Sequence, residues 1–579
     1  MRGKRLAEVA AVVAGAGAAA LIGAHEVVTH FGQLGVANDW DLHLHWYWVA
    51  RESVARFHQF PLWNPWACGG TPLLGDAESA VWTPMFLLQL ALGIVKGSQV
   101  EIVLHLAVAV AGGYVLGRTL DQGRWGAAAV GLFFAGSSWF AAHLAEGHGW
   151  ALTYAYVPWT AAALLLAFKR NRLLPAALAG AVLALMVGEG GIYPAPHTVL
   201  LLGILTLFAL GRRRRQPLLA LAVCGVIALL LAAPKLGPVL DLLRQNPRRV
   251  PSHESMTLGV LWQALFGWHQ DFRTALPHDR WYWGYQEYSA FIGPVVALCA
   301  AVGAVVRFRR AGAWICAALV FVALAMGDVT SGLWKAHPTL PLSPWALLHA
   351  LPLFSSQHVP SRFLVMFVLC VAVLAGYGIQ ALAARLGKWG PAAALALIAT
   401  GFAVHTEVGA PNLRHMFEGS PPVVPTQPAF RQLYASTDRV MLPLAEANLG
   451  ALHCYDFGAL RAHAHASNRP GYRGEVWLNG PGTVALSRWS PNALSYDVTA
   501  DHPETLFINQ NYDAPWRVRA GQGTVKNERG LLAVSVPAGE QHLELAYVSR
   551  HFQLGLALFA LGVSGVLGLF IWERRRARR

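Results

Sequence analysis

The residues best suited to chemistry lie between Asn38 and Pro84, just after the first apolar segment. This stretch, NDWDLHLHWYWVARESVARFHQFPLWNPWACGGTPLLGDAESAVWTP, packs acids, histidines and tryptophans between segments that are apolar enough to lie in a membrane. A carboxylate beside an imidazole can take a proton from a hydroxyl group. A loop that only joined two membrane spans would not need this density, and we interpret the stretch as an active-site loop.

The spacing of side chains from Asp41 onward predicts an amphipathic helix that lies along the membrane surface. One side of this helix is apolar and carries Leu42, Trp46, Val49 and Phe57. Another side carries four residues at i, i+4, i+7 and i+11, which are Asp41, His45, Trp48 and Glu52. This second side would face away from lipid, with the Asp41 carboxylate and the His45 imidazole within reach of each other.

Each acid in this loop also has a purely structural explanation. Asn38 or Asp39 can cap the helix, and the helix dipole favours an acid in the first turn. We expect Asp39 to be the cap and Asp41 to be the catalytic carboxylate, with Asp39 as the fallback. Asp76 and Glu78, in GDAESA, form an acidic pair that would either bind a divalent cation such as Mg or Mn or simply be solvated.

Later apolar segments end in polar residues that would reach the same side of the membrane as this loop. The candidate substrate-binding residues are Trp48, Glu52, Glu146, His148, Glu189, Tyr193, His197 and Arg362. Arg362 stands out because it opens an apolar helix on the side where the positive-inside rule disfavours basic residues. A fixed cation there suits an anionic headgroup or phosphate, and a side chain that only snorkels to lipid headgroups is the alternative.

A membrane-embedded bundle must position these residues. The chain has 579 residues, 55% of them hydrophobic and 13% charged, with a mean hydropathy of +0.40. Apolar runs of span length recur, which predicts a polytopic α-helical membrane protein with about twelve transmembrane helices. The expected spans lie near 7–24, 99–118, 125–142, 151–168, 173–188, 197–211, 217–233, 289–306, 312–327, 361–381, 391–408 and 552–572. The first run has no clear signal-peptide cleavage pattern and is counted as a span.

The formal net charge of +14 reports topology rather than nucleic-acid binding, because the basic residues fall in short blocks at the ends of apolar runs. The blocks are MRGKR, Arg118 with Arg124, Lys169 to Arg172, Arg212 to Arg215, Arg307 to Arg310, Arg385 with Lys388, and ERRRARR. Placing them in the cytoplasm puts both termini on the inner side of the membrane. The short apolar segment 81–95 would invert every later loop if it crossed, so we expect it to lie at the interface or to re-enter the membrane.

The chain divides into three parts on this topology. Residues 1–409 form the transmembrane core with extracytoplasmic loops 25–98, 234–288 and 328–360; residues 410–551 form an extracytoplasmic mixed or β-domain; and 552–579 form the last span with a basic tail. The alternating segments ALSYDVTA, ETLFINQ, WRVRA, LLAVSVPA and HLELAYV place a small β-domain at roughly 481–547. Among the six cysteines, Cys68 and Cys454 can meet outside as a disulfide, although we favour two unrelated thiols.

Three motifs carry a family resemblance. FPLWNPWACGGTPLLGD, PLFSSQHVPSRF, and INQNYDAPWRV followed by VPAGEQHLELAYVSRHFQLG resemble the YfhO family of bacterial membrane proteins in order and spacing. That family looks like part of the GT-C glycosyltransferase superfamily, whose members use a polyprenyl-phosphate-linked sugar and carry an essential acid in the first outer loop. The resemblance assigns that acid to Asp41, with His45 as the polar residue four positions later, and Asp39 as the fallback. The chain departs from the family pattern at Ala514-Pro515-Trp516, where PGW is usual.

The resemblance and the residues together predict a membrane glycosyltransferase. It would transfer a sugar from a polyprenyl-phosphate donor to a cell-envelope glycan, lipid or protein acceptor, by an inverting displacement in which Asp41 is the base. An ordinary Asp is a weak base, so we expect partial burial among tryptophans to raise its pKa. Two alternatives remain: a transporter or flippase for a lipid-linked glycan, and a non-catalytic scaffold whose β-domain binds glycans.

Overall fold

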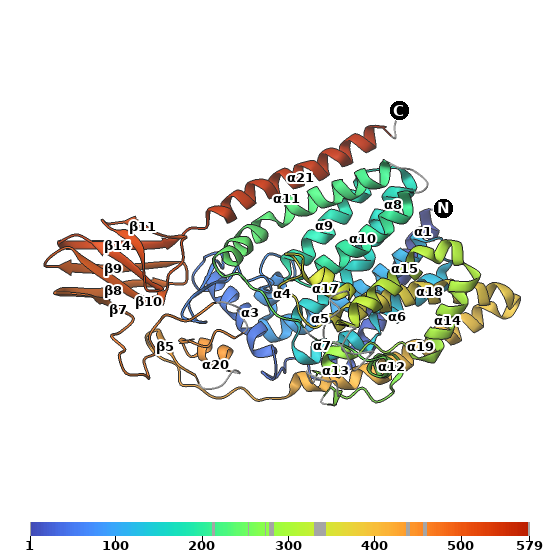
Figure 1. Cartoon of the computed structure of the whole chain (residues 1–579), viewed down its shortest axis with the longest axis horizontal. Helices are drawn as coiled ribbons and strands as arrows, with labels where there is room; N and C mark the ends of the chain where they lie inside the picture. The colour runs from blue at the N-terminus through green and yellow to red at the C-terminus, as the bar shows by residue number, and fades with distance from the viewer. Residues whose placement is uncertain are drawn as a thin grey trace.

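The computed structural model describes residues 2–210, 215–252, 254–272, 274–276, 283–328, 343–435, 440–455 and 460–576. The basic block at 212–214, part of the expected outer loop 328–360 and the last residues of the basic tail lie outside these ranges. The described chain forms a helical bundle with a β-sandwich at one end (Figure 1).

Ten helices in the described residues are long and apolar enough to cross a membrane. They are Leu6–Gly23, Ile94–Thr119, Arg124–Glu146, Gly149–Arg170, Gln216–Gln245, Tyr285–Val306, Phe308–Ala325, Pro360–Arg385, Gly387–Phe417 and Arg550–Arg576. Two shorter apolar helices, Leu174–Gly188 and Pro194–Leu210, complete the set. Each predicted span overlaps one of these segments, so the polytopic helical fold class is confirmed. The segment 81–95 forms only the seven-residue helix α4 (Phe86–Leu92), as expected for a piece that does not cross.

Helix ends that carry the basic blocks meet on one face of the bundle. The Arg118 guanidinium, at the end of α5 (Ile94–Thr119), lies 3.3 Å from Glu8 in α1 (Arg2–Gly23). The backbone N–H of Leu173, before α9 (Leu174–Gly188), donates to Glu573 near the end of α21 (Arg550–Arg576) at 2.8 Å. Both termini therefore lie on the face opposite the β-sandwich (Figure 1).

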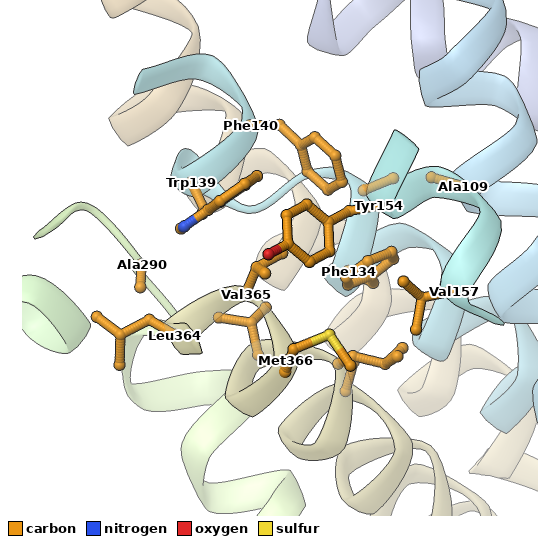
Figure 2. Packing of buried hydrophobic residues seen from close by; sticks show 14 of the residues in the cluster. Ala109, Phe134, Trp139, Phe140, Tyr154, Val157, Ala290, Leu364, Val365 and Met366 are labelled. Atoms are coloured by element: carbon orange, nitrogen blue, oxygen red, sulfur yellow. The ribbon is translucent and has the colours of Figure 1, made fainter. Parts of the chain in front are cut away.

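The bundle is held by a continuous apolar core around α18 (Leu364–Arg385), which is buried along most of its length. Figure 2 shows the part where Tyr154 and Trp139 pack over Val365 and Met366. α18 lies between α14 (Gly293–Val306), α15 (Phe308–Ala325) and α6 (Arg124–Ala135). Glycines let these helices approach closely: a Cβ on Gly378 would lie 1.8 Å from the Cys299 carbonyl oxygen. Because a central helix with no lipid-facing side must be apolar all round, its sequence shows no polar stripe.

The first loop forms α3 (Trp40–Ala55), followed by the short strand pair β1 (Trp63–Asn64) and β2 (Thr71–Pro72). The expectation that α3 is an amphipathic helix at the membrane surface is wrong. Residues on both expected sides, including Asp41, Leu42, His45 and Trp46, are buried within the protein. The physical reason is that most of the first three turns of α3 are covered on one side by the spans and on the other by α20 (Met441–Glu446), and only its last residues, around Glu52 and Ala55, reach the surface.

The β-sandwich consists of two four-stranded antiparallel sheets, with strand orders β12-β13-β10-β7 and β11-β14-β9-β8. The strands are β7 (Val476–Leu478), β8 (Gly482–Ser490), β9 (Ala493–Ala500), β10 (Glu504–Asn511), β11 (Trp516–Ala520), β12 (Thr524–Glu528), β13 (Leu531–Val536) and β14 (Gly539–Tyr547). All five predicted strand segments are present. β7, β8 and β12 were not predicted; β8 is exposed along most of its length, so no buried face marks it as a strand.

A disulfide joins the first loop to the chain that precedes the sandwich. Cys68 and Cys454 are bonded, with their Cα atoms 4.3 Å apart, so our preference for two unrelated thiols is wrong. The pairing follows from the fold: the Cys68 N–H donates to the Ala451 carbonyl at 2.7 Å, which brings the end of β6 (Leu449–Ala451) against the loop. A disulfide of this kind is typical of a compartment that is oxidising.

Candidate active site

A charged cavity of about 270 Å³ lies at the end of the bundle nearer the β-sandwich. Its wall comes from the start of α3, the loop 75–78, the turn after α7 (Ser138–Glu146), the end of α11 (Gln216–Gln245) and the start of α18. The acidic and basic residues that line it are Asp39, Asp76, Glu78, Glu146, His148, Arg248, Glu287, His358 and Arg362. Six of the residues predicted from sequence to bind substrate or metal therefore share one cavity with Asp39: Asp76, Glu78, Glu146, His148, Tyr193 and Arg362.

Asp39 presents its carboxylate to this cavity. It occupies the cap position of α3 but makes no side-chain hydrogen bond to the helix, so the expectation that it is a cap is wrong. Its Oδ2 lies 3.3 Å from Nε2 of His148, and its Oδ1 accepts a short hydrogen bond from the Tyr455 hydroxyl. Burial raises the pKa of Asp39, but His148 and Tyr455 outweigh burial and bring this pKa down to about 2. The carboxylate is therefore anionic at neutral pH.

A close backbone approach holds Asp39 beside His148. Gly147 has a φ of +97°, and a Cβ on it would lie 2.4 Å from the backbone nitrogen of Trp40. The Asp39 N–H donates to the Glu146 carbonyl at 2.8 Å. Only glycine combines this left-handed backbone with such proximity, and it fixes the end of α7 against the start of α3.

His148 contacts a second imidazole, that of His143. Its Nδ1 lies 2.7 Å from Nδ1 of His143, and its ring stacks on Trp150 with centroids 5.0 Å apart. His143 is buried, and its ring lies against Trp139 with centroids 4.0 Å apart and planes inclined by 42°. Asp39, His148 and His143 thus form a row of a carboxylate and two imidazoles. In such a row each group fixes the orientation and tautomer of the next.

Arg362 provides a fixed cation in the wall. Its Nε and Nη2 donate to the two oxygens of Glu287 at 2.9 and 2.5 Å. The guanidinium also lies over the rings of Trp150 and Tyr193, 4.8 and 4.5 Å from their centroids. Within the described residues its Nη1 makes no hydrogen bond, which leaves a donor for an anionic ligand. The planar fork of arginine suits bidentate contact with a carboxylate on one edge and a phosphate on another.

Asp76 and Glu78 line the cavity, but their surroundings do not fit a divalent cation. Lys235 in α11 donates to the carbonyls of Asp76 and Ser79 at 2.5 and 2.7 Å, and its positive charge together with Arg248 already faces the acidic pair. At the same cavity, ligand atoms of His143, His148 and Glu287 lie within 4.8 Å of one another. Glu287 is engaged on both oxygens by Arg362, and Mg or Mn prefer oxygen ligands. Neither group suits the predicted cation, and we route no step through a metal.

The structure places Asp41 and His45 away from the cavity. The Asp41 carboxylate is fully buried and accepts hydrogen bonds from the backbone N–H groups of Met441 and Leu442 at 2.8 and 3.0 Å. His45 contacts the Met441 carbonyl and the Asn64 amide at 3.2 and 3.0 Å. Burial raises the pKa of Asp41 to about 6, against the effect of the two backbone donors. The expected shift is present, but on a carboxylate that caps the start of α20 rather than one that faces a substrate.

The remaining candidates also have other partners. Glu189 accepts hydrogen bonds from Thr83, His105 and Tyr156 at 2.5, 2.9 and 3.0 Å, in a buried network that ties the first loop to α5. His197 bonds to the Tyr154 hydroxyl at 2.6 Å and stacks on Phe363. Trp48 packs edge-on against Trp66, and Glu52 lies 3.9 Å from Arg56 on the surface. None of the four lines the cavity around Asp39.

The wall residues that sequence reasoning missed include Trp150, Arg248, Glu287, His358 and Tyr455. Trp150 lies in the quoted motif HLAEGHGW, two positions after His148, so that motif held the signal. Glu287 lies in an aromatic-rich segment that we interpreted as an interfacial belt. Nothing in the sequence indicated that Tyr455 contacts Asp39, because the two residues lie more than 400 positions apart in the chain.

Loss of the disulfide is expected to loosen this site. Cys454 immediately precedes Tyr455, whose hydroxyl binds Asp39. Replacing both cysteines by serine should lower the free energy of unfolding by about 2–4 kcal/mol and should lower activity beyond the loss of folded protein. Thermal unfolding in detergent, with and without reductant, measures the first effect. Wild-type protein should shift with reductant and the double serine variant should not; equal shifts in both would rule out the disulfide as the cause.

The described chain is thus a polytopic helical membrane protein with a β-sandwich before its last helix and a charged cavity in the helical part. No protein-family model and no curated protein matches the sequence. Two cryo-EM structures of the arabinofuranosyltransferase AftD from Mycobacteria are similar to it. One aligns with a TM-score of 0.40 and 16% identity, covering 70% of this chain and 27% of the AftD chain. The other, a mutant, aligns with a TM-score of 0.39 and 12% identity, covering 93% and 60%. This chain spans less than two thirds of the AftD chain in both alignments, and membership of the YfhO family stays a prediction.

Proposed function

We propose that this protein is a membrane glycosyltransferase that moves a sugar from a polyprenyl-phosphate donor to a cell-envelope acceptor on the extracytoplasmic side. The observation that carries the proposal is the juxtaposition of Asp39 with Arg362 in one cavity. A transferase for such a donor needs an anionic base for the acceptor and a cation for the departing phosphate at the membrane edge. The motif resemblance to the YfhO family points to the same chemistry.

The proposed reaction is a single displacement. The acceptor hydroxyl oxygen attacks the anomeric carbon while the bond from that carbon to the phosphate oxygen breaks, and its electron pair leaves on polyprenyl phosphate. The proton of the hydroxyl passes to the Asp39 carboxylate. A carboxylate with a pKa near 2 is a weak base, but the hydroxyl becomes strongly acidic as its oxygen bonds to the electron-poor carbon. His148, which is held by His143 and Trp150, keeps the carboxylate in place.

The charges of the cavity support a phosphate at Arg362. Its guanidinium is held rigidly by Glu287 and two aromatic rings, so a phosphate contact costs little side-chain entropy. Leu242 and Leu243 on α11 line the same cavity and offer an apolar surface for the first isoprene units. Two further features support the outer side: the basic helix ends gather on the opposite face, and the disulfide lies close to the site.

Donor binding is expected to weaken as pH rises through neutrality. Burial raises the pKa of Glu78 to about 7; the Arg248 and Arg362 charges oppose this shift and the Asp76 and Asp39 charges reinforce it. Below that pKa Glu78 is neutral, whereas above it a further negative charge faces the donor phosphate. The KM for the donor should rise about three- to tenfold between pH 6 and pH 8, equivalent to about 1 kcal/mol. In the Glu78→Gln variant the KM should stay level; a rise in the variant equal to that of wild type would contradict this role.

The proposed activity can be tested with purified protein in detergent. A lipid extract that contains polyprenyl-phosphate sugars is added with a cell-envelope acceptor fraction, and free polyprenyl phosphate is measured by mass spectrometry. Release that depends on both the protein and the acceptor supports a transferase. A transporter or flippase would release none, because detergent leaves it nothing to move and it breaks no covalent bond. Absence of release with active, folded protein would reject the proposal.

A further inference from the structure

A second cavity, of about 470 Å³, lies between the end of α3, the segment around β5 (Arg431–Leu433) and the β-sandwich. None of its lining residues belongs to the cavity around Asp39. Its volume lies within the range of about 300–1,000 Å³ that is usual for binding sites of small ligands. Nothing in the proposed reaction uses it.

Aromatic rings form one wall of this second cavity. Trp489, at the end of β8, stacks on Phe430 with centroids 5.1 Å apart and planes inclined by 27°. Phe57 and Trp66 hold its edges at 5.7 and 5.3 Å. Trp489 remains half-buried, and its indole N–H makes no hydrogen bond within the described chain. The ring is therefore fixed in orientation by its neighbours while part of it stays available to a ligand.

Planar polar groups face the same space. Gln510 is 4% exposed; its Oε1 accepts from the indole N–H of Trp63 at 2.9 Å, and its amide NH₂ has no partner in the part of the chain that the structure describes. The Glu475 carboxyl accepts hydrogen bonds from the Gln432 N–H, the Tyr472 hydroxyl and the Asn509 amide at 2.9, 2.8 and 3.2 Å. Because Gln510 lines the cavity, this amide NH₂ can donate a hydrogen bond to a ligand there.

The rim of the cavity is positive. Arg431 is exposed and makes no ion pair among the described residues, and Arg56 lies 3.9 Å from Glu52 in a loose surface pair. Glu475 is the carboxylate that could balance these two positive charges. Burial raises the pKa of Glu475 to about 7, although its hydrogen-bond donors act in the opposite direction. Near neutral pH the two guanidinium groups are thus only partly compensated. A lipid tail would gain nothing from this rim, whereas an anionic polar ligand would.

A sugar chain matches this combination. The C–H face of a pyranose or furanose ring packs on an aromatic ring, and its hydroxyl groups bond to planar amide and guanidinium donors. We propose that this cavity binds an acidic oligosaccharide, with one sugar ring against Trp489 and its carboxylate or phosphate at Arg431 and Arg56. That the oligosaccharide is a segment of the acceptor glycan rests on the proposed function.

A glycan array tests this proposal. Fluorescently labelled full-length protein in detergent is applied to an array of bacterial-envelope glycans that includes neutral members and members with uronate or phosphate groups. We expect retention on the acidic glycans. Trp489→Ala and Arg431→Gln should lower it at least tenfold, whereas Trp389→Ala, which removes an exposed tryptophan elsewhere, should leave it unchanged. Arg431→Gln alters only a surface side chain and serves if Trp489→Ala fails to fold.

Two results would overturn the proposal: no glycan retained by wild type above the Trp489→Ala background, or neutral glycans retained as well as acidic ones and unaffected by Arg431→Gln. The same array with Asp39→Asn separates this inference from the proposed activity. Binding by Asp39→Asn, together with a failure of wild type to release polyprenyl phosphate, would keep the glycan site and reject the transferase. Sugar transfer by wild type without any binding on the array would keep the transferase and reject the glycan site.

Discussion

Asp39→Asn is expected to lower glycosyl transfer by about a thousandfold while the protein remains folded. General-base catalysis contributes about 10²–10⁴ in rate, and the asparagine amide cannot take the acceptor proton. Because Asp39 is partly exposed in the cavity and asparagine has the same shape, the variant should keep most of its stability. The measurement is single-turnover transfer at saturating donor, which reports the chemical step rather than binding.

Asp41→Asn is the matched control for this experiment. Its carboxylate accepts two backbone N–H groups at the start of α20, and the asparagine amide NH₂ would face one of those donors. We expect this variant to lose about 1.5–3 kcal/mol of stability, the usual value of a hydrogen bond to a charged group, and to keep nearly full turnover per folded molecule. Full turnover by Asp39→Asn with none by folded Asp41→Asn would show that the catalytic residue has been wrongly assigned.

Arg362→Lys is expected to reduce kcat/KM for the donor by about a hundredfold. Lysine keeps the positive charge but loses the planar fork that contacts Glu287 on one edge and leaves Nη1 for the phosphate. Loss of one preorganised donor to a developing anion typically costs about 10²–10³ in rate. Initial rates over a range of donor concentrations separate the effect on KM from that on kcat.

The control for Arg362 is Glu287→Gln, which keeps the arginine and removes the charge of its partner. Breaking a buried ion pair costs about 3–5 kcal/mol when one charge is left unpaired, and glutamine still accepts a hydrogen bond from Arg362. If Arg362 binds the phosphate, Glu287→Gln should retain much more activity than Arg362→Lys. Equal losses in both variants would mean that the pair only supports the fold.

The membrane architecture could be predicted because it depends on local composition. Most spans are apolar runs long enough to cross a membrane, and the predicted strands of the sandwich are short segments that mix apolar and polar residues between turn residues. β8 was not predicted, and most of its residues are exposed, so it has no buried face. α11 also differed from expectation: Pro234 and Pro238 lie inside one helix of 30 residues, although we ended the span before them. Prolines are tolerated in membrane helices where neighbouring groups satisfy the freed carbonyls.

The roles of the two acids in the first loop could not be predicted, because they depend on distant segments. Sequence spacing shows that Asp41 and His45 share a face, but Met441, to which both bond, comes some 400 residues later. Asp39 stands where a helix cap is expected, yet Tyr455 and His148 draw its carboxylate into the cavity. The position of an acid within a helix can be predicted from the local sequence. The partners of its carboxylate cannot, because tertiary packing determines them.

Selective labelling of the cavity in intact cells tests most directly whether a lipid-phosphate sugar occupies it from the outer side. Leu243 lines the cavity and is 37% exposed, and Leu386, between α18 and α19 (Gly390–Gly409), is 49% exposed at the other end of the bundle. A membrane-impermeant maleimide should label Leu243→Cys in intact cells, and added polyprenyl-phosphate sugar should slow this labelling. Leu386→Cys should react only after the membrane is opened, with no effect of the donor. Labelling of Leu243→Cys only from the cell interior, or at a rate that the donor does not change, would contradict the account.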